Sequence, residues 1–241
     1  MGIGEVGEFL WIGRRVSLVL GAARGLARIH LEYNASKIPH GNIKTCNILL
    51  DKNGVAHVSD FGLALLLSPS HATARLGGYA APEQAETRKL SQEADVYAFG
   101  VLVLEVLTGR VPNQWHGLSG NGEGPVTGAD GRALTSTLPE WVRSVVREEW
   151  TAEVFDVELV RYKNVEEEMV SMLHVGLACS ARQPEARPPM FEVVRMIEDI
   201  RVEQSPLAED DDELNEPRIP ISPSFPTTPT EDGRQSYALT E

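Results

Sequence analysis

Two short segments hold the side chains of this chain that are best suited to chemistry. Residues 40–47 read HGNIKTCN and residues 60–62 read DFG. Asn47 and Asp60 offer the amide and carboxylate oxygens that hard divalent cations take as ligands. Asn42 is different, because an amide has no basic form near neutral pH and cannot take a proton from a reacting hydroxyl. The two segments therefore retain oxygen donors for a metal ion but lack a general base.

The spacing of these residues resembles the catalytic loop and metal-binding turn of protein kinases, which read H-R-D-x-K-x-x-N and D-F-G. This chain has Gly41 at the arginine position and Asn42 at the aspartate position. In kinases that aspartate accepts the substrate hydroxyl proton. Loss of a positioned general base costs roughly 10²–10⁴ in rate, about 3–5 kcal/mol of barrier. Gly41 also removes the arginine that would grip a phosphorylated activation loop, so we do not expect switching by that route.

Hydrophobic periodicity predicts a mainly α fold around the two segments. We expect helices over residues 14–31, 91–108, 137–150, 166–181 and 189–201. The helix over 91–108 is apolar on nearly every side, which predicts a buried central helix closed by Gly109. His174, on the fourth helix, is expected to be a packing residue. Asn53 and Gly54 lie between two short apolar runs, which predicts a β-hairpin with positive φ at both residues.

Further motifs extend the resemblance over roughly four-fifths of the chain. In order and spacing they resemble the C-terminal lobe of plant leucine-rich-repeat receptor-like kinases, in particular those whose catalytic loop reads H-G-N. These motifs are GAARGLARIH (21–30), DVYAFGV (95–101), LTGR (107–110) and WVRSVVREEWT (141–151). The resemblance implies a protein-kinase-like C-terminal lobe, mainly α, with a short β-hairpin. Only 39 residues precede His40, so we expect the N-terminal lobe, with its Gly-rich loop and ATP lysine, to be absent.

The resemblance assigns catalytic and cofactor roles to individual residues. Lys44 matches the lysine that contacts the transferring phosphate, and Asn42 occupies the degenerate base position. Asn47 and Asp60 match the Mg²⁺ ligands. ATP and Mg²⁺ are therefore the cofactors that the resemblance implies, although the expected absence of the N-terminal lobe removes most of the adenine and phosphate cradle.

The resemblance also assigns structural roles. His40, Phe61 and Asp95 match the stacked and hydrogen-bonded residues that anchor the catalytic loop to the buried helix. Glu83 belongs to the A-P-E motif (81–83) that closes the activation segment. Arg187 matches the arginine that forms a buried ion pair with this glutamate, and separation of such a pair would leave an uncompensated charge.

Charge and composition divide the chain. The net charge is −13 and the isoelectric point is about 4.9, which argues against nucleic acid as a partner. Ten acidic residues and two arginines fall within residues 203–241, which are also rich in Pro, Ser and Thr. We expect this tail to be disordered, residues 11–202 to form the kinase-like lobe with a mobile loop at 110–136, and residues 1–10 to be flexible.

Cysteine usage and hydropathy indicate the compartment. Cys46 and Cys179 form no metal-binding pattern and fit a reducing environment. The longest apolar run, residues 96–104, is about half the length that crosses a bilayer, so we expect no membrane segment. The first ten residues lack the basic region of a signal peptide. These features indicate a cytoplasmic chain, on the cytoplasmic face of the plasma membrane if it is part of an intact receptor.

Three functional hypotheses remain open on the sequence. The first is a pseudokinase that signals by binding other kinases or signalling scaffolds. The second is a weak Ser/Thr protein kinase that uses ATP and Mg²⁺, because phosphoryl transfer depends largely on positioning and electrostatics. The third is a truncated, non-functional fragment.

Overall fold

The computed structural model describes residues 12–112, 137–147, 153–160 and 165–200. All of these belong to the first of the two units into which the chain divides, residues 1–204. The flexible start (1–10), most of the mobile loop (110–136) and the tail (203–241) expected from the sequence lie outside the described residues. So does the end of the helix expected over 137–150.

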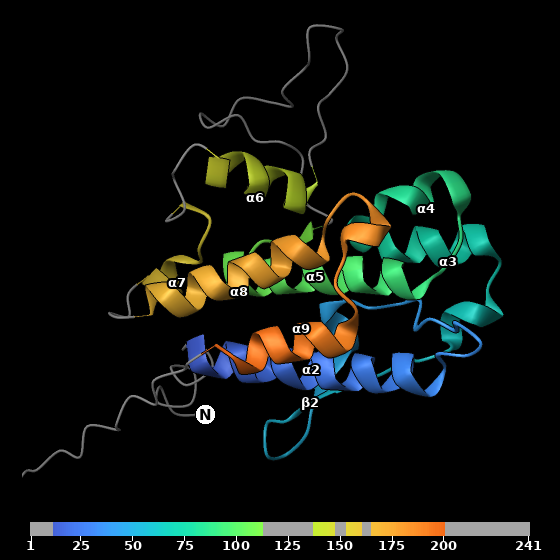
Figure 1. The fold of residues 1–241 in the computed structure, drawn as a ribbon, viewed down its shortest axis with the longest axis horizontal. Coiled ribbons are helices and arrows are strands. Elements are labelled where there is room, and N and C mark those ends of the chain that lie inside the picture. The colour runs from blue at the N-terminus through green and yellow to red at the C-terminus, as the bar shows by residue number, and fades with distance from the viewer. Residues whose placement is uncertain (1–11, 113–136, 148–152, 161–164, 201–241) are drawn as a thin grey trace, which may run out of the picture. The chain divides into compact units, whose positions relative to one another are not determined.

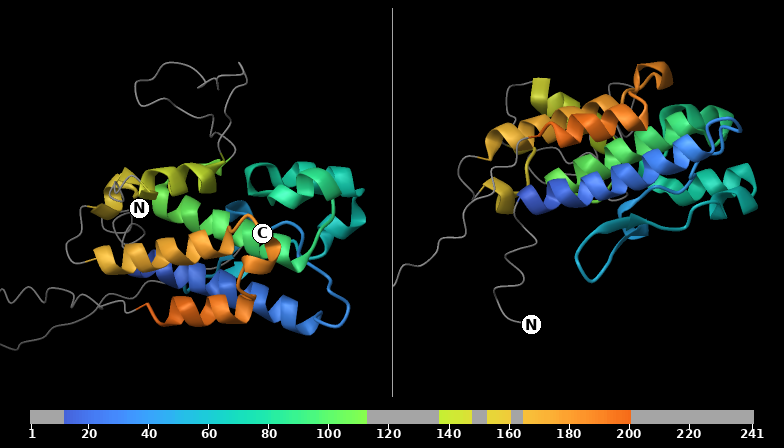
Figure 2. Two further views of the ribbon diagram at one scale, coloured as in Figure 1. Left: turned by 45° about the horizontal axis from the view of Figure 1, so that its top comes forward. Right: turned by 60° about the horizontal axis from the view of Figure 1, so that its bottom comes forward.

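Two pairs of helices form the body of the described region (Figures 1 and 2). α2 (Ile12–Glu32) lies along α9 (Met190–Glu198), and α5 (Gln92–Thr108) lies along α8 (Glu166–Cys179). Residues 94–104 of α5 are all buried, which confirms the central helix predicted from its apolar character. Ser91 accepts a hydrogen bond from Ala94 N at its start, and Gly109 ends it in the left-handed region with φ 67°.

α5 and α8 approach each other closely at Gly100. A Cβ atom at this position would lie 2.7 Å from Ser180 N and 2.9 Å from Gly176 O. The backbone of one helix therefore occupies the space that a side chain of the other would need, and only glycine fits there.

Shorter helices complete the described region. α6 (Leu138–Arg147) contacts α5, and α7 (Val157–Val160) follows it in the chain. α3 (Pro69–Leu76), α4 (Pro82–Thr87) and four 3₁₀ turns were not predicted; the turns are η1 (Thr45–Asn47), η2 (Leu63–Leu66), η3 (Gly77–Tyr79) and η6 (Pro184–Ala186). His174 is exposed on α8, so its expected packing role was wrong. Within the described residues, no helix combines the length and the apolar content needed to cross a bilayer.

The predicted hairpin is present, and it is packed against α2. β1 (Ile48–Leu50) and β2 (Ala56–Val58) pair antiparallel, with Leu50 opposite Ala56. The predicted turn was wrong, because of its two central residues only Gly54 has a positive φ, at 73°. The Asp51 carboxylate instead accepts the backbone N–H groups of Asn53 (2.8 Å) and Val55 (2.9 Å). These bonds organise a five-residue loop rather than a two-residue turn.

Candidate functional site

The hairpin register brings the two candidate metal ligands to the same place. Ile48 pairs with Val58, so Asn47 and Ser59 lie opposite each other just beyond the last pair. Ser59 donates from its backbone N (2.9 Å) and its Oγ (3.0 Å) to Asn47 O. Asp60 is the next residue, so the end of the hairpin brings the backbone of Asp60 near that of Asn47.

The side chains of Asn47 and Asp60 are suited to one Mg²⁺ ion. Asn47 is buried and donates from Nδ2 to Asn42 O at 2.8 Å, so its Oδ1 faces the other way. This oxygen receives only a weak contact from Cys46 Sγ, at 3.6 Å. Asp60 is exposed, and its carboxylate has no hydrogen-bond partner among the described residues. Its φ of 65° is one that aspartate tolerates. Mg²⁺ takes one or two protein oxygens together with phosphate oxygens, so this pair fits it.

Such an ion would neutralise the charge on nucleotide phosphates when it is bound. The described residues contain no group of three or more His, Cys, Asp or Glu side chains that could hold a metal without other ligands. Lys44 lies next to η1 and is partly exposed, and its ammonium has no hydrogen-bond partner among the described residues. Its positive charge is therefore free to meet a phosphate.

Asp95, near the start of α5, holds the catalytic loop by its main chain. Its Oδ2 accepts from His40 N at 2.6 Å, and its Oδ1 accepts from Gly41 N at 2.8 Å. His30 Nε2 on α2 lies 3.0 Å from Oδ2. Asp95 is 3% exposed, and these partners satisfy a carboxylate that would otherwise be costly to bury.

His40 lies beneath the loop as a neutral ring. Its Nδ1 accepts from Asn42 N at 3.2 Å, so the ring proton is on Nε2, which donates to Ser59 O at 2.9 Å. Burial lowers the pKa of His40 below its usual value, in agreement with a neutral ring. The Phe61 ring lies 6.0 Å from the His40 ring and 5.1 Å from the Tyr33 ring, measured between centroids.

The two positions that depart from the kinase pattern are closely packed. Asn42 is 5% exposed, and its Oδ1 is buried without a hydrogen-bond partner. Gly41 has a φ of 77°, and a Cβ atom there would lie 2.9 Å from both Ala64 Cβ and Leu90 Cδ1. The space beside Gly41 is therefore filled by apolar side chains, and an arginine would require both a strained backbone and displaced neighbours.

The activation segment is joined to the helical body at its end. Arg187 donates from Nη1 to Glu83 Oε1 and from Nη2 to Glu83 Oε2, both at 2.7 Å, in a two-pronged arrangement. Arg187 also donates to Ala181 O at 2.8 Å and to Glu93 O at 2.9 Å, and it lies over the Tyr97 ring. Its side chain is 1% exposed and that of Glu83 is 25% exposed.

A further contact between the activation segment and the catalytic loop was not predicted. Tyr79 donates its hydroxyl hydrogen to Glu105 on α5, and its oxygen lies 3.1 Å from Thr45 Oγ1. Burial raises the pKa values of both Tyr79 and Glu105. The contacts of His30 and Tyr33 were missed in the same way. His30 lies near the end of α2 and Tyr33 lies just beyond it, and hydrophobic periodicity gives no signal for such contacts.

Comparison with known proteins identifies this arrangement. Residues 14–194 match the family described as Protein kinase domain. The leucine-rich repeat receptor-like protein kinase PXC1 of Arabidopsis thaliana is 63% identical over 215 residues, covering 89% of this chain and 32% of PXC1. The probable inactive receptor kinase At4g23740 of the same plant is 47% identical over 187 residues, covering 77% of this chain and 27% of that protein.

A solved structure agrees with these relatives. The pseudokinase domain of BIR2, described as an immune regulator of the RLK/Pelle family, superposes with a TM-score of 0.63 at 32% identity, covering 80% of this chain and 53% of that one. The chain spans about a third or less of the length of PXC1 and of At4g23740. The predicted kinase-like fold is thereby confirmed. The chain belongs to the protein kinase domain family and, within it, to the kinase domains of plant leucine-rich-repeat receptor-like kinases.

Proposed function

We propose that this chain is a pseudokinase that signals by binding other kinases or signalling scaffolds rather than by transferring phosphate. The observation that carries the proposal is Asn42 at the base position. Its backbone N–H donates to His40 Nδ1 and its carbonyl accepts from Asn47 Nδ2, so the residue is held in place while its amide cannot accept a proton. The loop keeps the shape of a catalytic site without the group that takes the proton.

The relatives support the same reading. At4g23740 is named as a probable inactive receptor kinase, and the BIR2 domain is described as a pseudokinase and an immune regulator. A domain of such a receptor lies on the cytoplasmic face of the plasma membrane, where its partners would be the cytoplasmic domains of other receptors. We place this chain there by analogy with the family.

A weak Ser/Thr kinase is the second candidate, and one observation favours it. Asp60, Asn47 and Lys44, the residues that the resemblance assigns to magnesium and phosphate, are all retained, and Asp60 is exposed. PXC1, in addition, is named as a protein kinase. Positioning and charge alone supply much of the acceleration of phosphoryl transfer.

The decisive experiment uses the native polypeptide isolated from plant extract with an antibody against residues 203–241. Its mass is determined, and transfer of the labelled γ-phosphate of ATP to a Ser/Thr peptide is measured. The same polypeptide is expressed with Asn42→Asp and with Asp60→Ala. We expect no transfer by the wild type above the Asp60→Ala background. Transfer by the wild type that Asp60→Ala abolishes would overturn the proposal, and a gain in Asn42→Asp alone would show that loss of the base is the cause.

A further inference from the structure

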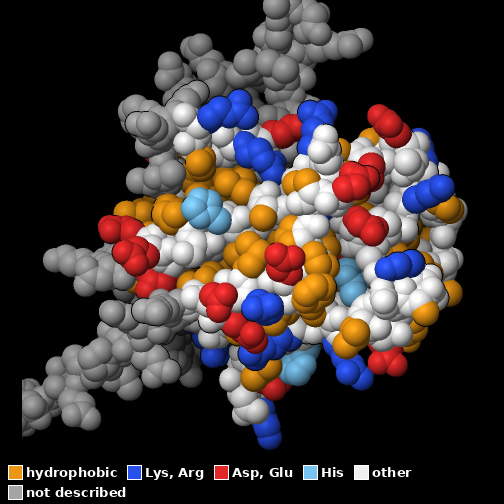
Figure 3. All heavy atoms as spheres, viewed as in Figure 1, with side chains coloured by type: hydrophobic (Ala, Val, Ile, Leu, Met, Phe, Trp, Pro, Cys, Tyr) orange, Lys and Arg blue, Asp and Glu red, His pale blue; other side chains and the backbone are white. Residues whose placement is uncertain are grey.

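A large open groove lies between α2, the start of α5 and the start of α9. Its volume is about 780 Å³. The floor and walls are largely apolar, with Ala27, Val96, Met190 and Val194 among the lining residues. Figure 3 shows apolar side chains open to solvent across the middle of the face that it draws, among basic and acidic ones.

Two bulky apolar side chains project from the walls of this groove. Leu31 on α2 is 69% exposed, and Phe191 on α9 is 67% exposed. Exposed apolar side chains of this size gain stability when a partner removes them from water. Together they give the groove an apolar anchor point.

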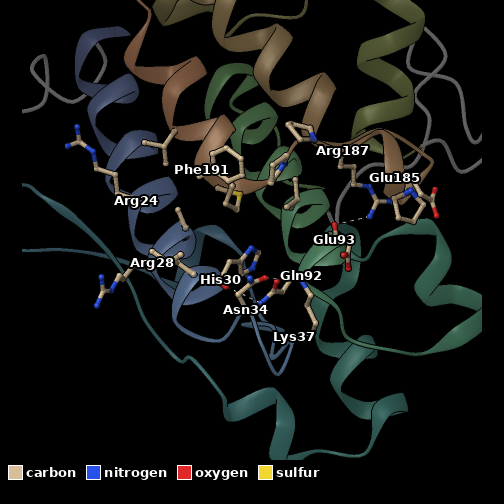
Figure 4. A pocket seen from close by; sticks show the side chains of 18 residues that line it. Arg24, Arg28, His30, Asn34, Lys37, Gln92, Glu93, Glu185, Arg187 and Phe191 are labelled. Carbon is tan, nitrogen blue, oxygen red and sulfur yellow. Dashed lines mark hydrogen bonds between the residues drawn. The ribbon is translucent and has the colours of Figure 1, made fainter.

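The exposed charges of the groove differ between its two ends (Figure 4). Arg24 and Arg28 lie at one end, Glu93 and Glu185 lie at the other, and Phe191 lies between the two pairs. Arg187 also lies at the second end, but its side chain is 1% exposed and its charge is paired with Glu83. Lys37 lies beside Gln92. This division is unexpected on a chain with a net charge of −13. A partner segment that complements these four exposed side chains carries acidic side chains at one end and basic side chains at the other.

The cations at the basic end are available to a partner. Arg24 pairs with Glu198 at 2.7 Å and Arg28 pairs with Glu32 at 3.2 Å, and all four side chains are at least 41% exposed. Exposed pairs of this kind contribute little to stability. Carboxylates of a partner can replace these intramolecular ones at little cost, particularly where the apolar contact removes water from the same place.

The groove also shares residues with the machinery that holds the candidate site. His30 contacts Asp95, which anchors the catalytic loop, and Arg187 pairs with Glu83 at the end of the activation segment. Both His30 and Arg187 line the groove. A segment bound there would lie against the residues that fix the loop and the activation segment.

We infer that this groove binds a segment of a partner protein in which a bulky apolar residue separates an acidic end from a basic end. The acidic end faces Arg24 and Arg28, the apolar residue packs against Leu31 and Phe191, and the basic end faces Glu93 and Glu185. This inference rests on the proposed docking role. It does not depend on Asn42, so failure of peptide binding and detection of phosphoryl transfer are separate outcomes.

The test uses two fluorescent helical peptides of identical composition and no net charge. In the block peptide, glutamates fill one half, lysines fill the other and a tryptophan lies between them; in the scrambled peptide, the charges alternate. Anisotropy titrations with the full chain should show that the block peptide binds at least about tenfold more tightly than the scrambled one. Phe191→Ala should weaken block-peptide binding by about tenfold or more.

A charge swap separates recognition from a general loss of structure. Arg24→Glu combined with Arg28→Glu should lose the block peptide but bind a peptide with lysines in both halves around the same tryptophan. The matched controls are Val157→Ala, an equally exposed apolar side chain on α7, and Arg75→Glu, an exposed cation on α3; neither lines the groove. Both controls should bind the block peptide as the wild type does.

Two results would overturn the inference. The first is equal affinity for the block and scrambled peptides, or block-peptide binding that survives Phe191→Ala. The second is a dimer of this chain, seen by sedimentation equilibrium, that Phe191→Ala dissociates, because the groove would then be occupied by a second copy rather than by a partner segment.

Discussion

Arg187→Ala is the substitution that most directly tests how the activation segment is joined to the helical body. It removes a guanidinium group that is 1% exposed and that makes two 2.7 Å bonds to Glu83. It also leaves the carbonyl groups of Ala181 and Glu93 without this donor. The remaining Glu83 carboxylate would have no partner for its charge.

The size of the loss follows from this geometry. Removal of one partner of a buried ion pair typically costs about 3–5 kcal/mol. Glu83 is 25% exposed and can be partly hydrated, so we expect the lower end, about 3 kcal/mol. For a domain of this size that corresponds to a fall of about 6–12 °C in melting temperature. Glu83→Gln keeps an acceptor for Arg187 and should cost less, about 1.5–3 kcal/mol.

Urea denaturation of the full chain, followed by circular dichroism, measures these differences. Arg182→Ala is the matched control, because Arg182 is an exposed arginine only five positions away, and its loss should change the free energy of unfolding by about 0.5 kcal/mol or less. A loss below about 1 kcal/mol for Arg187→Ala, or one equal to that of the control, would refute the view that this pair supports the fold.

Four further predictions concern packing and thiol chemistry. Gly41→Arg should lower the free energy of unfolding by about 2–4 kcal/mol, as measured by urea denaturation. Gly62→Ala is the control and should cost only about 1–2 kcal/mol, because Gly62 has a φ of 81° but a Cβ atom there would have no neighbour within 4 Å. Gly100→Ala should cost about 1–3 kcal/mol in the same assay, because backbone atoms of α8 fill the space. In native protein, Ellman's reagent should label exposed Cys46 but not buried Cys179, which should react only after unfolding. Burial raises the pKa of Cys179 to about 12, so the folded protein keeps this thiol protonated at pH values where the unfolded chain ionises it. The free energy of unfolding should therefore fall as pH rises from about 8.5 towards 12, and melting temperatures across that range measure the fall.

The long elements of the fold could be predicted from the sequence because their signals are local. The apolar character of residues 91–108 and Gly109 at their end predicted α5 almost to its bounds. The hairpin was predicted correctly from two apolar runs, but the prediction for its turn was wrong. The side chain of Asp51 organises that loop, and the Asn-Gly pattern carries no signal for this contact.

Other features depend on tertiary contacts that no local pattern carries. α3 buries Ala72 and Leu76, too few apolar positions to give a helical period. The contact of Tyr79 with Glu105 and Thr45 joins three distant segments. The groove is likewise assembled from residues 24–37, 92–96 and 184–194. Such sites become visible only when the chain is folded.

The way in which Asp95 holds the catalytic loop bears on how an inactive kinase can arise. Its carboxylate binds main-chain amide groups, and every residue except proline supplies one. The side chain at position 42 contributes no hydrogen bond through its Oδ1, so an exchange of aspartate for asparagine there leaves the anchor untouched. A gene copy can therefore lose proton transfer through a single codon change and still encode a well-formed domain, which selection can then retain for binding alone.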